Sequence, residues 1–154
     1  MPLNVGDRAP DFTLPADGGG TLSLKELAGL NVVLYFYPKD DTPGCTAEAC
    51  AFRDASPLFT SADTAIVGIS RDSVPRHEKF KAKHSLPFAL LSDTDGAVTE
   101  AYGVWVEKTL YGRTSMGIER ATFLIDRDGV ISHIWRKVRV PGHVEAVLDA
   151  AAAD

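Results

Sequence analysis

A continuous apolar run, VVLYFY at residues 32–37, constrains this 154-residue chain more than any other stretch. A run of β-branched, aliphatic and aromatic residues without polar alternation is typical of a strand that is buried on both faces of a sheet. Pro38 ends the run, because proline cannot donate a hydrogen bond to a strand ladder. The sequence therefore predicts a central strand over residues 32–37.

A helix start follows this strand within a few residues. Thr42 stands where an N-cap is expected, and Pro43 takes the first helical position, where its missing N–H costs nothing. Cys45 is then the third residue of the helix, and its thiol lies near free backbone N–H groups and the positive end of the helix dipole. Thiols in such places exist largely as thiolates near neutral pH, which is the nucleophilic form.

Cys45 has two plainer interpretations. A lone cysteine is usually a small buried hydrophobic residue, but this one follows a strand end, where open α/β sheets place their functional sites. A zinc site is the second alternative. Cys45 and Cys50 are the only cysteines, and their C-x4-C spacing matches no zinc pattern. The histidines are scattered and are interpreted as structural or surface residues; they are His77, His84, His133 and His143.

Charged residues near the predicted site are less informative. Lys39, Asp40 and Asp41 are interpreted as a solvated turn rather than a catalytic set. Arg120 is ambiguous on spacing alone. Most arginines lie at the surface, but this one immediately precedes the apolar stretch 121–125, and burial of that stretch would hold it rigidly.

Size and composition indicate one globular domain over residues 1–154 with a proper core, since 45% of the residues are hydrophobic. The formal charge of −5 shows no excess of basic residues, so we expect neither nucleic acid nor an anionic membrane as the main partner. The first residues contain no signal-peptide pattern, which makes a cytoplasmic protein the expectation. Two cysteines in an intracellular chain favour chemistry over a disulfide scaffold.

Strand and helix patterns alternate along the chain. Besides 32–37, we expect strands at 11–14, 22–24, 65–70, 88–91, 121–125 and 130–136. We expect helices from 43 to about 56, where Pro57 ends or kinks the first, from 73 to about 84 and from about 143 to 152, with shorter turns at 25–28 and 98–102. The polar segment 108–119 is predicted to be a loop or hairpin arm. This order predicts an α/β fold with a mixed β-sheet flanked by helices on both faces.

The same residues carry a family resemblance. Pro38, Thr42 and Cys45 fit the P-x-x-x-T-x-x-C motif of the peroxiredoxins. The longer string FYPKDDTPGCTAEAC resembles the subgroup called bacterioferritin comigratory protein, or peroxiredoxin Q. The resemblance covers nearly the whole chain, through APDFTLP, IVGISRDS, LLSDTDG, AYGVW and YGRTSMGIERATFLID. It implies a thioredoxin-like fold and no metal, haem or flavin cofactor.

The resemblance also implies a role for each matched residue. Cys45 would be the peroxidatic cysteine, Thr42 would hydrogen-bond the thiolate and the substrate, and Arg120 would pair with both. Pro38 would shield the site. Glu48 matches a position that often holds a polar partner of the arginine, and Cys50 matches the resolving cysteine of members that carry it in the same helix.

Helix geometry conflicts with a direct bond between the two cysteines. On an ideal helix, residues five apart have Cα atoms about 8.6 Å from each other. A disulfide tolerates roughly 4.4–6.8 Å. We therefore expect the helix to unwind locally, from Pro43 to about Arg53, during each turnover.

Together with these observations, the resemblance implies a thiol peroxidase that reduces hydrogen peroxide and organic hydroperoxides. Cys45 would become a sulfenic acid and form a disulfide with Cys50, which thioredoxin or a similar dithiol would reduce. The subgroup implies a monomer. Two alternatives stay open: a thiol–disulfide oxidoreductase, disfavoured by the absence of C-x-x-C, and a redox-sensing or holdase module switched by the disulfide.

Overall fold

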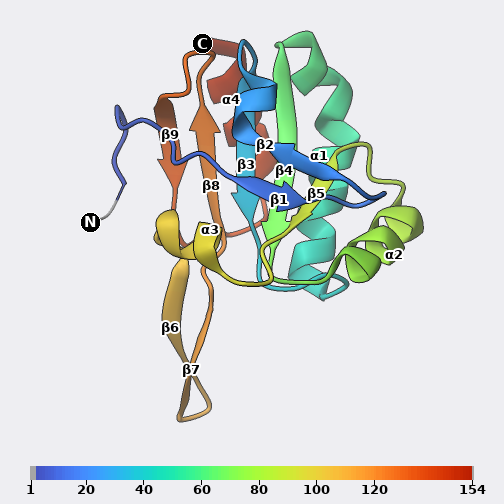
Figure 1. The fold of residues 1–154 in the computed structure, drawn as a ribbon, viewed down its shortest axis with the longest axis vertical. Helices are drawn as coiled ribbons and strands as arrows, with labels where there is room; N and C mark the ends of the chain where they lie inside the picture. Colours follow the sequence, from blue (N-terminus) through green and yellow to red (C-terminus); the bar gives the residue numbers. More distant parts are fainter. Residues whose placement is uncertain (1–2, 154) are drawn as a thin grey trace.

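The computed structural model describes residues 3–153. Within them, five strands form the central sheet in the order β5-β4-β3-β8-β9 (Figure 1). These are β3 (Asn31–Phe36), β4 (Thr64–Ser70), β5 (Ala89–Ser92), β8 (Ala121–Ile125) and β9 (Ile131–Trp135). The strands β3, β4 and β5 run parallel, whereas β8 is antiparallel to both β3 and β9. The predicted mixed sheet is confirmed.

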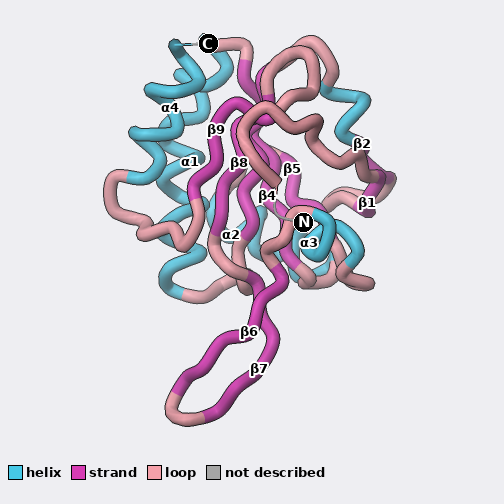
Figure 2. Tube along the Cα trace, turned by 90° about the vertical axis from the view of Figure 1, so that its left-hand side faces the viewer, coloured by secondary structure: helices cyan, strands magenta, loops and turns pink. Residues whose placement is uncertain are grey.

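The helices divide unequally between the two faces of the sheet. The long helices α1 (Pro43–Ser61), α2 (Val74–His84) and α4 (His143–Ala153) contribute to the hydrophobic cluster on one face. The other face carries the hairpin of β1 (Thr13–Pro15) and β2 (Thr21–Ser23), the 3-10 helix η1 (Leu24–Leu27) and the short helix α3 (Ala97–Ala101). The prediction of helices on both faces therefore holds, with the long ones gathered on one side (Figure 2).

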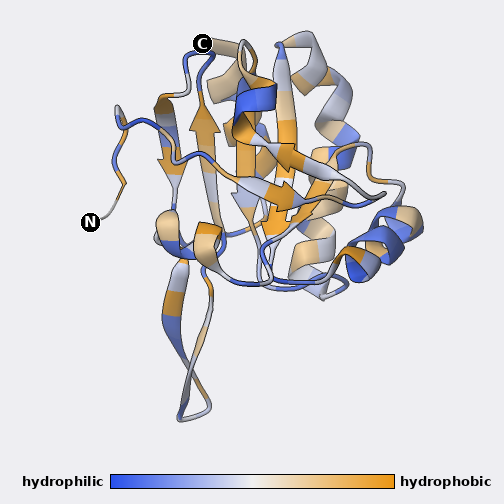
Figure 3. Cartoon of the chain, viewed as in Figure 1, coloured by the Kyte–Doolittle hydropathy of each residue, from blue (hydrophilic) through white to orange (hydrophobic). Residues whose placement is uncertain are grey.

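The central strand β3 explains why the apolar run was so informative. All six of its residues are buried. Val33 and Tyr35 belong to the cluster beneath α1, whereas Val32, Leu34 and Phe36 belong to the cluster on the opposite face. Both faces of β3 are thus covered, and Figure 3 shows hydrophobic colouring along the central strands. The strand lies one residue earlier than the predicted 32–37.

Helix α1 runs further than predicted. The expected end at about residue 56 is wrong, because the helix continues through Pro57 to Ser61. A proline inside a helix removes one backbone hydrogen bond and strains the preceding turn. Phe59 lies beyond the proline, is fully buried and packs against Phe52 with ring centroids 5.9 Å apart. Burial of this aromatic ring offsets the lost bond and keeps the last turns helical.

The segment predicted as a loop or hairpin arm is a hairpin. It consists of β6 (Trp105–Leu110) and β7 (Arg113–Ile118), which pair antiparallel and project from one end of the molecule (Figures 1 and 2). The predicted helices at 73–84 and 143–152 are confirmed to within one residue. Among the described residues, no helix is both long enough and apolar enough to cross a bilayer.

Candidate active site

The register of β3 against β8 brings two distant segments together. Phe36, the last residue of β3, pairs with Ala121, the first residue of β8. Because the two strands are antiparallel, the residue before β8, Arg120, lies beside the loop that leads from β3 into α1. The end of β3, the start of β8 and the first turn of α1 thus converge at one edge of the sheet.

Cys45 occupies the third position of α1 and is only 2% exposed. The Nη2 atom of Arg120 donates a hydrogen bond to its Sγ atom at 3.3 Å. The Nη1 atom of the same guanidinium donates to Oε1 of Glu48 at 2.6 Å. One planar cation therefore connects the thiol to a buried carboxylate one turn further along α1. Such fixed, charged donors stabilise anions in a poorly solvated site.

Burial and neighbouring charges both shift the pKa values of the groups in this cluster. Burial raises the pKa of Glu48 to about 7, although the guanidinium of Arg120 acts in the opposite direction. Burial lowers the pKa of Arg120, but Glu48 and Cys45 outweigh it, so the net shift is upward and the guanidinium stays charged. Burial, followed by the nearby Arg120, lowers the pKa of His143 to about 4, so that imidazole is neutral at pH 7.

Thr42 and Pro38 border this cluster. Thr42 is the N-cap residue of α1, as predicted, but its side chain makes no capping hydrogen bond. Its hydroxyl donates instead to the carbonyl of Lys39 at 2.8 Å. Pro38 is half-buried in the loop between β3 and α1. The structure brings both residues to the edge where Cys45 and Arg120 meet, and their roles toward thiolate and substrate stay predictions.

Asp40 does not belong to a solvated turn, so that part of the interpretation is wrong. Its side chain is buried, with the residue 3% exposed. The hydroxyl of Tyr37 donates to Oδ1 at 2.5 Å, and Nδ1 of His77 lies 2.6 Å from Oδ2. The backbone N–H of Asp40 donates to Asp72 at 2.7 Å. These partners pull the carboxylate inward and fix the loop before α1, whereas Lys39 stays exposed.

Asp40, Asp72 and His77 also form a grouping that could hold a metal ion, with ligand atoms within 4.8 Å of one another. The atoms are already engaged, however. The Nε2 atom of His77 lies 2.9 Å from the carbonyl of Leu91, and Asp72 accepts from Ser70 at 3.0 Å. The grouping is thus explained as a structural network.

Cys50 lies five residues after Cys45 in α1, about 1.4 helical turns further along. Its thiol is free, as is that of Cys45, and it is half-buried. The Sγ atom of Cys50 lies 3.8 Å from Nδ1 of His84, the last residue of α2. The interpretation of His77 as a structural residue agrees with its buried contacts, but the sequence did not indicate that His84 contacts Cys50, because the two residues meet only through the fold.

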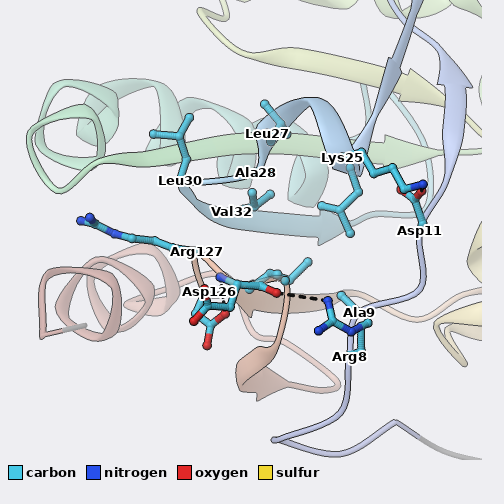
Figure 4. Close-up of a pocket in the computed structure, with 14 residues that line it drawn as sticks. Arg8, Ala9, Asp11, Lys25, Leu27, Ala28, Leu30, Val32, Asp126 and Arg127 are labelled. Carbon is cyan, nitrogen blue, oxygen red and sulfur yellow. Dashed lines mark hydrogen bonds and ion pairs between the residues drawn. The ribbon is translucent and has the colours of Figure 1, made fainter.

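A separate pocket lies at the other end of β3. It is lined by the start of that strand at Val32, by η1 and by the turn after β8, with Leu27, Leu30, Asp126 and Arg127 among its residues (Figure 4). Its walls are largely apolar, and its lining contains neither cysteine. The pocket is therefore separate from the cluster of Cys45, Glu48 and Arg120.

A buried thiol at a helix start, in contact with a guanidinium at the edge of a mixed sheet, is the arrangement that a reactive cysteine requires. The AhpC/TSA family model matches residues 5–134. The chain is 57% identical to a bcp peroxiredoxin of Coxiella burnetii over 148 residues, which cover 96% of this chain and 98% of that one.

Solved structures agree. A PrxQ mutant of Xylella fastidiosa superposes with a TM-score of 0.94 at 39% identity, covering 99% of this chain and 98% of that one. A bacterioferritin comigratory protein of Xanthomonas campestris, described by its alkyl peroxide reduction activity, gives 0.88 at 46% identity, covering 92% and 90%.

The chain belongs to the AhpC/TSA family. Within that family it is a peroxiredoxin of the bacterioferritin comigratory protein, or peroxiredoxin Q, subgroup, and therefore a thiol peroxidase with a thioredoxin-like fold. The resemblance carried by FYPKDDTPGCTAEAC is confirmed.

Proposed function

We propose that Cys45 is the peroxidatic cysteine of this peroxidase. Its thiolate attacks one oxygen of the peroxide, the O–O bond breaks, and the departing oxygen leaves as water or an alcohol once protonated. The observation that carries this assignment is the 3.3 Å contact between the Arg120 guanidinium and the Cys45 sulfur. Among the described residues, no guanidinium donates a hydrogen bond to the Cys50 sulfur, which instead lies 3.8 Å from a ring nitrogen of His84 and interacts with Arg53 through charge alone.

Arg120 has two tasks in this proposal. Its Nη2 atom holds the thiolate before reaction and binds the charge that builds on the leaving oxygen. The 2.6 Å bond to Glu48 prevents the guanidinium from rotating away. Thr42 supplies a further donor after its hydroxyl turns from the Lys39 carbonyl, and Pro38 shields the sulfur from water.

Cys50 is the resolving cysteine in this proposal. Its sulfur displaces hydroxide from the sulfenic acid of Cys45, giving an intramolecular disulfide and water. Both cysteines belong to one continuous helix, α1, on which their Cα atoms are about 8.6 Å apart by ideal geometry. The helix therefore opens between Pro43 and about Arg53 before the bond forms.

The finer assignments complete the proposal. Organic hydroperoxides are substrates beside hydrogen peroxide, an inference supported by the alkyl peroxide activity of the Xanthomonas campestris relative. A thioredoxin-like dithiol reduces the disulfide. We further propose that residues 1–154 form a single domain that acts as a monomer in the cytoplasm.

A coupled assay tests this function. With thioredoxin, thioredoxin reductase and NADPH, the protein should consume cumene hydroperoxide and hydrogen peroxide over many turnovers. Oxidation that stops after one equivalent, despite active thioredoxin, would indicate a redox sensor instead. Reduction of protein disulfides without peroxide consumption would indicate a thiol–disulfide oxidoreductase.

A further inference from the structure

His84 is the side chain that contacts the sulfur of Cys50, and the guanidinium of Arg53 lies close enough to interact with this thiol through its charge. The Nδ1 atom of His84 lies 3.8 Å from Sγ, within hydrogen-bonding distance for sulfur. The histidine ends α2, while the cysteine lies in α1, so the contact joins two helices. Its side chain is 19% exposed.

The imidazole is held in place from two directions. Its ring packs edge-on against Phe80, one turn earlier in α2, with centroids 5.2 Å apart. Its backbone carbonyl accepts a hydrogen bond from Nη1 of Arg53 at 2.9 Å. Because Arg53 lies three residues after Cys50 on α1, this bond fixes the end of α2 against the turn that carries the thiol.

The other ring nitrogen indicates which tautomer is present. Nε2 is buried and has no hydrogen-bond partner among the described residues, and Oδ1 of Asp41 lies 4.0 Å away. The hydrogen bond from Lys83 lowers the pKa of Asp41, so this carboxylate is ionised at neutral pH. A negative charge beside Nε2 favours the proton on that nitrogen and leaves the lone pair of Nδ1 directed at sulfur.

We propose that His84 is the general base that activates Cys50, and that Asp41 is a positioning residue that keeps the proton of the neutral imidazole on Nε2. The proposal rests on the function proposed above, in which Cys50 resolves the sulfenic acid. His84 Nδ1 takes the thiol proton, and the Cys50 thiolate attacks the sulfur of Cys45. An S–S bond forms and the S–O bond breaks. The hydroxide that leaves takes a proton from solvent, the imidazolium returns one to solvent, and one water is released in total.

The order of events follows from the positions of the groups. In the intact helix, Cys50 lies within reach of His84 and out of reach of Cys45. Proton removal therefore precedes the opening of α1, and the opened segment carries a thiolate rather than a thiol. Thiolates, not thiols, are the attacking species in disulfide formation.

If the contact were purely structural, removing His84 would change the rate of disulfide formation in the opposite direction. If His84 only anchored Cys50 in the helix, its removal would ease the opening of α1 and would leave disulfide formation unchanged or faster. If His84 is a base, its removal slows disulfide formation.

The test follows both steps of one turnover by quenched flow and intact mass. His84→Asn keeps a polar group near the Nδ1 position but cannot accept the proton. At pH 7, it should slow disulfide formation by about five- to thirtyfold, because an unassisted thiol is only a few per cent thiolate. The deficit should disappear near pH 10, where ordinary thiols ionise unaided. His133→Asn is the matched control, since His133 lies on β9 and stacks on Trp135.

A second variant tests the same role of His84 independently of the asparagine substitution. His84→Ala leaves a space beside Cys50, and added imidazole should restore disulfide formation in a concentration-dependent manner without affecting the control. An unchanged or faster second step in His84→Asn at pH 7, or a deficit that persists at pH 10 and does not respond to imidazole, would overturn the role of His84. Failure of the wild type to form a Cys45 sulfenic acid would instead contradict the proposed function.

Discussion

Replacing Gly44 with alanine should make α1 more stable and at the same time make Cys45 react more slowly with peroxide. Gly44 is the second residue of α1, where alanine is the better helix former by up to about 1 kcal/mol. A Cβ atom there would lie 3.1 Å from Nη2 of Arg120, so the guanidinium must give way by a few tenths of an ångström. That nitrogen is the one that donates to the Cys45 sulfur.

The size of the effect follows from this contact. Lengthening it from 3.3 Å by about 0.3 Å weakens the attraction between guanidinium and thiolate by about 0.4 kcal/mol at an effective dielectric constant of about 20, or about twofold in rate. Complete loss of the charge-assisted hydrogen bond would cost about 1.5–3 kcal/mol, or up to about a hundredfold. We therefore expect a rate loss between about twofold and a hundredfold.

Stopped-flow measurement of the first oxidation step, together with thermal unfolding, tests this prediction. Gly44→Ala should react more slowly with peroxide yet unfold at a higher temperature. Thr60→Ala is the matched control, because it improves helix propensity at an exposed position of α1 far along the helix. A stabilised Gly44→Ala protein that reacts at the wild-type rate would refute the reasoning that the position of Arg120 controls the first step.

Three further predictions follow from the site. Arg120→Lys should fold normally but lose one to three decades in peroxide rate, because lysine lacks the planar fork that reaches both Cys45 and Glu48; wild-type kinetics would remove Arg120 from the site. The pKa of Glu48 rises from 4.5 in the unfolded chain to about 7 in the folded protein, so its contribution to stability is fully present below pH 4.5 and is lost as the pH rises to about 7. The free energy of unfolding by urea should therefore rise in Glu48→Gln relative to wild type by up to about 3 kcal/mol across that pH range. If the free energy of unfolding of the two proteins depended on pH in the same way, the raised pKa of Glu48 would be contradicted. Amide exchange over residues 43–54 should speed up when the Cys45–Cys50 disulfide forms, while β3 and β8 stay protected; equal exchange in both redox forms would show that no unwinding is needed.

The elements that the sequence predicted well are those whose signals are local. The run at residues 32–37 indicates a strand because every residue of β3 is buried. Pro43 marks the start of α1 because a proline suits the first helical position. Pro57 misled the prediction of the helix end, since the burial of Phe59 is a tertiary effect that a local rule does not include.

The contacts that build the site are not local. Asp40 is buried by His77, 37 residues away, and the partner of Cys50 lies 34 residues away in His84. The pairing of Arg120 with Cys45 spans 75 residues and was expected only through the family resemblance. Spacing along the chain indicates which helix turn a thiol occupies, but only the register of β3 against β8 determines which cation faces it.

The most direct test of the central claim counts thiols and mass after one equivalent of peroxide. The wild type should lose two hydrogens and both free thiols, giving the Cys45–Cys50 disulfide. Cys50→Ser should gain one oxygen, as a sulfenic acid on Cys45, and Cys45→Ser should leave the peroxide unconsumed. Near-normal peroxide consumption by Cys45→Ser would contradict the account.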